Sequence, residues 1–121
     1  MIYPHKELQV ILRSDEMLSH AFASMQAKKL DGLKTNKDLD EMDTLIRDFL
    51  TRLIHHVEKW APEQLKPLFE EVYLLQYEFM EFDQETGEET PLLLEETEEL
   101  FFLFQEDLSP QDILKELIKA K

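Results

Sequence analysis

The segment KDLDEMDTLIRDFLTRLIHHVEKW, residues 37–60, decides the fold of this chain. Its apolar side chains recur at intervals of three and four, the spacing that places them on one face of an α-helix. They are Leu39, Met42, Leu45, Ile46, Phe49, Leu50, Leu53, Ile54, Val57 and Trp60. Thr35 and Asp38 have the spacing of a capping box, with Asp in place of the usual Glu or Gln. We therefore predict a long central helix, ended by Ala61-Pro62, whose apolar face is covered by other elements.

Two shorter helices are predicted upstream of the central helix. They span residues 4–13 and 15–29, and Ser14 is the candidate N-cap between them. Gly32 follows the second helix, where glycine readily adopts the left-handed conformation that closes a helix. The N-terminal third of the chain is thus expected to supply two helices that pack against the central one.

Three more helices are predicted downstream, over residues 67–82, 91–106 and 110–120. Each begins with a proline, which is tolerated in the first turn because the N–H there has no helical partner. Ser109 precedes the last of them as its N-cap. The polar segment 83–90, with a glycine at its centre, is expected to be a solvated connection.

The composition favours an all-α fold. The chain has 121 residues, only two glycines and no sustained alternation of apolar and polar residues, so strands and hairpin turns have little to form from. Its apolar content of 43% is too high for an acidic disordered segment. We predict one acidic domain over residues 1–121, a bundle of five or six antiparallel or partly orthogonal helices.

The negative charge is concentrated in one region. The formal net charge is −14, and residues 63–107 hold one Lys/Arg against fifteen Asp/Glu. Residues 1–62 hold nine against ten, and residues 108–121 hold three against two. Such a field attracts basic surfaces and repels phosphates. We expect a basic protein or a basic amphipathic helix as partner, and no direct contact with nucleic acid or membrane.

Targeting signals and thiol chemistry are not visible in the sequence. The first residues lack a basic stretch followed by an apolar one, and the longest apolar run, Leu100 to Phe104, is far shorter than a membrane helix. Cysteine is absent, which removes disulfides, thiolate metal sites and thiol nucleophiles. A soluble, cytoplasmic protein is expected.

No motif for catalysis stands out. The chain contains no Gly-x-Ser-x-Gly turn and no glycine-rich phosphate loop, because Gly32 and Gly87 are isolated. Carboxylates are so abundant that no pair is singled out for acid–base work. We predict that the protein is not an enzyme and needs no cofactor.

A metal site is the main alternative to a binding surface. His55 and His56 are adjacent, so on a helix their side chains point about 100° apart and cannot both bind one ion without another element. Arg52 and Lys59 flank them and oppose a cation. The segment from Asp83 also fails as a calcium loop, since its glycine is not at position six. No metal site is predicted.

Helical geometry arranges part of the acidic residues around two large apolar side chains. A helix over residues 67–82 would place Leu74 opposite the core stripe. The carboxylates around Leu74 would be Glu70, Glu71, Glu78 and Glu81. A helix over residues 91–106 would surround Phe102 in the same way. The carboxylates around Phe102 would be Glu95, Glu98, Glu99 and Glu106.

Two interpretations of Leu74 and Phe102 follow. The N-terminal helices could cover both, because a helix in a small bundle can be buried on two faces. Otherwise each is an exposed apolar anchor inside an acidic rim, as found in protein interfaces. In either case, crowding of the carboxylates is expected to raise their pKa values by mutual repulsion.

The sequence therefore predicts a non-catalytic protein-binding module, at the extreme an inhibitor that mimics nucleic-acid charge to neutralise a basic partner. The alternative is a metal-assisted hydrolase or metal sensor. It would use His20, His55 or His56 together with carboxylates that folding brings close.

Overall fold

The computed structural model describes residues 6–82 and 84–119. Within them the chain forms six α-helices, which confirms the prediction of an all-α bundle. The helices are α1 (Lys6–Ser14), α2 (Glu16–Asp31), α3 (Asn36–Val57), α4 (Pro62–Leu74), α5 (Glu95–Phe102) and α6 (Pro110–Lys119). Two short 3₁₀ helices, η1 (Leu75–Phe79) and η2 (Leu103–Gln105), continue α4 and α5. The strands β1 (Met80–Phe82) and β2 (Glu89–Pro91) pair in a small antiparallel hairpin.

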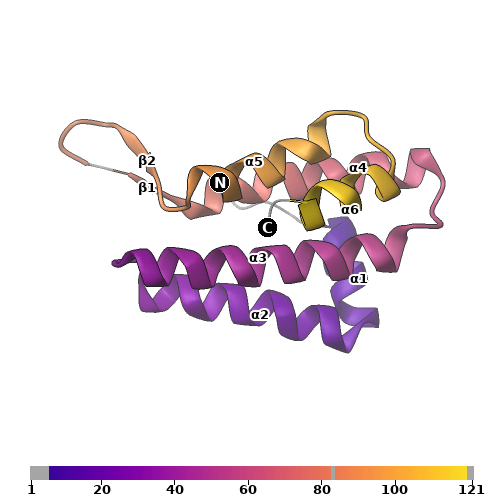
Figure 1. Ribbon diagram of the computed structural model, residues 1–121, viewed down its shortest axis with the longest axis horizontal. Coiled ribbons are helices and arrows are strands. Elements are labelled where there is room, and N and C mark those ends of the chain that lie inside the picture. Colours follow the sequence, from indigo (N-terminus) through magenta and orange to yellow (C-terminus); the bar gives the residue numbers. More distant parts are fainter. Residues whose placement is uncertain (1–5, 83, 120–121) are drawn as a thin grey trace.

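The long helix α3 lies between the other helices (Figure 1). α2 runs beside it on one side, while α4 and α5 lie on the other side. α6 packs against α3, and the short α1 contacts both α2 and α4. The bundle is thus built around the helix that the apolar stripe of residues 37–60 predicts.

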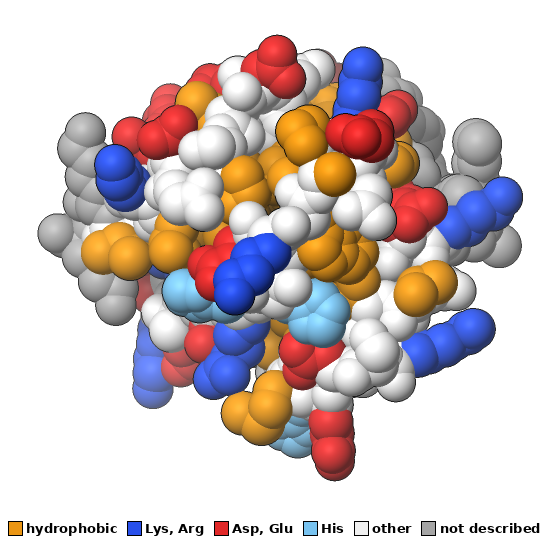
Figure 2. All heavy atoms as spheres, turned by 90° about the vertical axis from the view of Figure 1, so that its right-hand side faces the viewer, with side chains coloured by type: hydrophobic (Ala, Val, Ile, Leu, Met, Phe, Trp, Pro, Cys, Tyr) orange, Lys and Arg blue, Asp and Glu red, His pale blue; other side chains and the backbone are white. Residues whose placement is uncertain are grey.

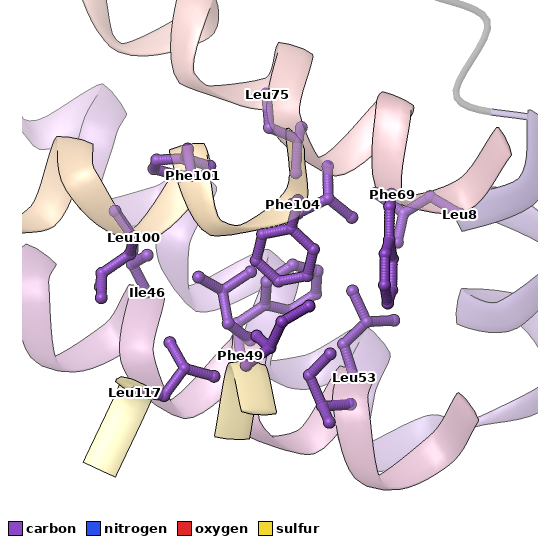
Figure 3. Close-up of a cluster of buried hydrophobic side chains, with 14 of the residues drawn as sticks. Leu8, Ile46, Phe49, Leu53, Phe69, Leu75, Leu100, Phe101, Phe104 and Leu117 are labelled. Carbon is purple, nitrogen blue, oxygen red and sulfur yellow. The ribbon is translucent and has the colours of Figure 1, made fainter. Parts of the chain in front are cut away.

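The core lies where these helices face one another. Figure 3 shows side chains from α1, α3, α4, α5 and α6 pointing into one cluster. Among the labelled ones are Leu8, Phe49, Phe101 and Leu117, all buried. Because one continuous cluster includes residues from both ends of the described chain, the helices share a single hydrophobic core.

The caps predicted at Thr35 and Gly32 are present, whereas the one predicted at Ser14 is not. Thr35 and Asp38 form the predicted capping box, and Gly32 closes α2 with a φ of 98°. The N-cap of α2 is Asp15, not Ser14: its carboxylate accepts the N–H of Leu18 at 3.0 Å. The Ser14 hydroxyl instead donates to the carbonyl of Ile11, so it serves the end of α1.

The junction between α3 and α4 differs from the prediction. α3 ends at Val57, and the N–H of Trp60 donates to the Val57 carbonyl at 3.0 Å in a closing turn. α4 begins at Pro62, five residues before the predicted start, so Pro67 lies inside the helix and not in its first turn. The side chain of Gln64 accepts the N–H of Ala61 at 3.1 Å and stabilises this earlier start.

The predicted helix over residues 67–82 is wrong in its second half. The backbone tightens into a 3₁₀ helix after Leu74 and then extends into β1, which pairs antiparallel with β2. Strands of three residues are too short to show an alternating pattern, and their pairing depends on residues distant in sequence. The hairpin projects from one end of the bundle (Figure 1).

α5 consequently begins later than expected. Pro91 pairs with Met80 in the hairpin, and the N–H of Leu92 donates to the Phe79 carbonyl at 2.8 Å. The chain is therefore still extended where the sequence predicts a helix, and α5 starts at Glu95. Its helical turns end at Phe102, after which η2 leads into the connection to α6.

Candidate partner-binding surface

A groove of about 1050 Å³, which we call the α4 groove, follows α4 from Pro62 to Leu74. α4 contributes a face of side chains spaced three or four residues apart, including Leu65, Phe69 and Tyr73. The connection from α3 closes one end with Trp60. The opposite wall is formed by residues 104–105 of η2 and by residues 107–109 of the connection between η2 and α6. The groove is therefore built mainly from one helix face and one loop.

The floor of the α4 groove is apolar and its rim is acidic. Phe104 and Leu108 join the apolar side chains of α4 and the indole of Trp60 along the floor. The lining carboxylates are Glu58, Glu63, Glu70 and Asp107. Lys66 is the single Lys or Arg among the lining residues. Figure 2 looks onto the end of the bundle where α3 connects to α4, and hydrophobic side chains gather near the centre of this face with charged ones around them.

The loop wall is shaped by local backbone chemistry. Asp107 has a φ of 62°, a left-handed conformation that aspartate tolerates better than most residues. The hydroxyl of Ser109 accepts the N–H of Asp112 at 3.2 Å, as the predicted N-cap of α6, and Pro110 is buried behind it. These features hold the loop against the bundle and keep its apolar residues along the groove.

Phe102 lies beside the α4 groove and is 41% exposed. Its ring centroid is 5.8 Å from that of Tyr73, which lines the groove. The ring of Tyr73 in turn lies 6.3 Å from that of Tyr77, one turn further along. We call Tyr77, Tyr73 and Phe102 the aromatic row. It extends the apolar floor of the groove onto α5.

Leu74 is half-buried and lines the α4 groove together with Glu70. The four carboxylates predicted around it do not form a ring. Glu71 turns toward α1, where it accepts the N–H groups of Glu7 and Leu8 at 3.0 and 3.1 Å. Glu78 is half-buried in η1, and Glu81 lies in β1, where its side chain is outside the described part. For Glu78 and Glu81 the physical reason is the change from α-helix to 3₁₀ helix and strand after Leu74, which ends the helical spacing. Glu71 remains on α4, but its carboxylate is held by the first turn of α1.

The carboxylates predicted around Phe102 keep more of their helical spacing than those predicted around Leu74. Glu95, Glu98 and Glu99 all lie on α5, and Glu106 follows η2. Burial raises the pKa of the Glu98 carboxyl, and repulsion by the neighbouring Glu95 raises it further. The crowding predicted from the sequence therefore acts at Glu98, although burial is the larger cause.

The pKa shifts of Glu98, Asp38 and Asp15 predict that the stability of the fold passes through a maximum as the pH is lowered. A raised pKa means that folded Glu98 holds its proton more tightly than unfolded Glu98, so acidification from pH 7 toward 5 should stabilise slightly. The Lys28 ammonium and nearby backbone N–H groups lower the pKa of Asp38 to about 2, and the Leu18 N–H lowers that of Asp15. Their stabilisation is present above the ordinary pKa and is lost as pH falls below about 4.

Thermal denaturation between pH 7 and 3 measures this profile. We expect the midpoint to be highest near pH 5 and to fall steeply below pH 4. Asp38→Asn should flatten the acidic fall, and Glu98→Gln should remove the rise toward pH 5. A midpoint that drops steadily from pH 7 to 5 would show that the acidic surface is held by favourable partners instead.

The contact between Glu71 and α1 gives a second stability prediction. Its carboxylate satisfies two N–H groups in the first turn of α1 that have no helical partner. Glu71→Ala should therefore lower the free energy of unfolding by about 1–2 kcal/mol. The exposed neighbour Glu70 is the control, and its replacement by alanine should cost less than about 0.5 kcal/mol. Urea denaturation measures both, and equal losses would contradict the capping role.

The side chains of His55 and His56 lie near different carboxylates. His56 Nδ1 lies 2.9 Å from an Asp15 carboxylate oxygen, and His55 Nδ1 lies 3.7 Å from a Glu58 oxygen. His20 is exposed on α2. Among residues 6–82 and 84–119, no group of three or more His, Asp or Glu side chains is arranged to hold a metal ion. His5 lies outside the described residues.

Known proteins offer no guide to this surface. No protein-family model, curated protein or solved structure matches the chain. Among the helices of the described residues, none combines the length and apolar content that a membrane-spanning segment requires.

The α4 groove is the part of the surface that the sequence did not reveal. In the sequence, Phe69 and Tyr73 lie on one flank of the apolar stripe that contains Leu68, Val72 and Leu75, and Trp60 is the last residue of the stripe of residues 37–60. The signal in the sequence was the width of the apolar stripe on α4, which is greater than one packing partner would cover. Leu108 gave no such signal, because it precedes a helix start and its position depends on the loop.

Proposed function

We propose that the protein is a non-catalytic binding module of the cytoplasm that captures a basic protein surface through α4, η1 and α5. The observation that carries the proposal is the exposure of Phe102 in an aromatic row, beside an apolar groove, in the most acidic region of the chain. Apolar anchors surrounded by a charged rim are typical of protein interfaces.

The charge distribution supports a basic partner over any other class. Residues 63–107 carry fifteen of the 27 carboxylates and one of the 13 basic residues. A field of this sign speeds the approach of a basic surface and opposes phosphates. A partner that normally binds nucleic acid fits this chemistry, since the acidic face would compete for the same basic residues. In that case the protein would act as an inhibitor or neutraliser.

Retention of lysate proteins on the immobilised chain tests the proposal. The wild-type chain should retain basic proteins that a salt gradient releases. The Phe102→Ala chain should lose these proteins, because the anchor is removed. The double variant Glu98→Gln/Glu99→Gln should release them at lower salt, since rim charges mainly govern association and its salt dependence.

A matched variant separates local from general charge effects. Glu16→Gln/Asp40→Asn removes two exposed carboxylates from α2 and α3, outside the acidic region. It should behave as wild type. If all four chains retain the same proteins and release them at the same salt concentration, the acidic face is only a solvated surface and the proposal is wrong.

A further inference from the structure

We infer that the α4 groove receives an amphipathic basic α-helix of the partner, laid along α4. This inference rests on the proposed function and makes it more specific. The partner presents an α-helix, and that helix binds in the α4 groove. Its support comes from the length of the groove, from the chemistry of its floor and from the charges on its rim.

The length of the groove matches several helical turns. α4 lines it from Pro62 to Leu74, which corresponds to about 18 Å at 1.5 Å per residue. A helix of about 12 residues spans the same distance and presents apolar side chains at every third or fourth position. Such a helix would place a row of side chains along Leu65, Phe69 and Tyr73, and a single anchor would fill only part of the groove.

The apolar floor favours a helix over an extended peptide. A helix satisfies its own backbone N–H and C=O groups, so it can lie on apolar side chains without losing hydrogen bonds. An extended segment would leave those groups against the rings of Phe69 and Tyr73, where burial without partners is costly. Strand addition needs a sheet edge, and none of the residues that line the groove belongs to β1 or β2.

The rim selects the sign of the partner's charge. Glu58, Glu63, Glu70 and Asp107 face the groove against Lys66 alone. Lysine or arginine on the flanks of a seated helix would lie near these carboxylates, while acidic flanks would be repelled. The aromatic row continues the seat toward Phe102, and the face of an exposed ring there also attracts a cation.

Trp60 makes the groove directly observable, because it is the single tryptophan of the chain and lines the groove. Three tryptophan-free peptides of 18 residues are titrated into the full chain while Trp60 fluorescence is recorded. The first is an amphipathic helix of Leu and Lys, the second has the same composition in a shuffled order, and the third replaces every Lys with Glu. The amphipathic Leu/Lys peptide should shift the emission and bind at least 10-fold tighter than the shuffled one. The Leu/Glu peptide should not bind.

Two charge reversals locate the site. Glu70→Lys at the groove should weaken binding of the Leu/Lys helix at least 10-fold. Glu88→Lys makes the same charge change at an exposed position of the hairpin and should have a much smaller effect. Thermal melting of both variants shows whether each is folded. If Glu70→Lys does not fold, Glu63→Lys at the same rim replaces it.

The outcomes separate this inference from the proposed function. If the shuffled peptide binds as tightly as the helix, or if Glu88→Lys weakens binding as much as Glu70→Lys, the acidic face binds basic chains without a helical seat and the inference is wrong. If neither lysine peptide binds, the inference is also wrong, while the proposed function is still judged by retention of lysate proteins. If the neutral dye Nile red binds at Trp60 and the Leu/Lys helix does not displace it, the groove takes a small apolar ligand instead.

Discussion

Phe101→Ala should lower the free energy of unfolding by about 3–5 kcal/mol, whereas Phe102→Ala should lower it by only about 1 kcal/mol. The two residues are adjacent on α5 and chemically identical, but they face opposite environments. Phe101 is 0% exposed and packs against Phe79, with 6.4 Å between ring centroids. Phe102 is 41% exposed, and its ring lies 5.8 Å from that of Tyr73.

Urea denaturation followed by circular dichroism and by Trp60 fluorescence measures this difference. The cost of a truncation follows the volume removed from the packed interior, so the buried ring should dominate. A loss at Phe102 as large as that at Phe101 would show that Phe102 is a core residue. It would then have no part in a partner surface.

The second large effect is expected at Asp43 on α3, whose carboxylate contacts α5 directly and α6 through Arg47. Its carboxylate accepts the Arg47 Nε–H at 2.7 Å and the hydroxyl of Thr97, which lies on α5. Arg47 also donates through Nη1 to the carbonyl of Leu117 on α6, at 3.2 Å. Thr97 is buried and the side chain of Arg47 is only 11% exposed, so water can replace a lost partner only in part. Asp43→Ala should therefore destabilise by about 3–5 kcal/mol, because it leaves a buried guanidinium without its counter-ion.

Asp48 provides a control of identical spacing. It pairs with Arg52 at 3.0 Å, also four residues apart on α3, but both side chains are exposed. Asp48→Ala should cost less than about 0.5 kcal/mol, as is usual for surface pairs. Equal losses for Asp43→Ala and Asp48→Ala in urea denaturation would contradict the structural role of the buried network.

The elements recovered from the sequence are those specified by local chemistry. α3 follows from its periodic stripe, the capping box from Thr35 and Asp38, and the end of α2 from Gly32. Each depends on residues a few positions apart, which is the range over which sequence patterns report structure. The break at Ser14 was predicted, but the N-cap of α2 was assigned to Ser14 because two neighbouring residues can both cap, and only the structure shows that Asp15 accepts the Leu18 N–H.

The hairpin and the candidate surface depend on contacts between distant residues. β1 and β2 pair residues that lie seven to eleven positions apart in the sequence, from Phe82 with Glu89 to Met80 with Pro91. The ring around Leu74 failed for the same reason, because pairing of β1 ends the helix that the pattern of α4 continued. Phe102 was singled out in the sequence as a large apolar residue among carboxylates. Its exposure, however, depends on how α4 and α5 pack.

Calorimetric titration of the retained partner into the wild-type chain and into Phe102→Ala tests the central claim most directly. A desolvated anchor is worth about 2 kcal/mol or more, so the variant should bind about 30-fold more weakly. Its dependence on salt should be nearly unchanged, since no charge is altered. A Phe102→Ala chain that melts normally and binds the partner with wild-type affinity would contradict the account.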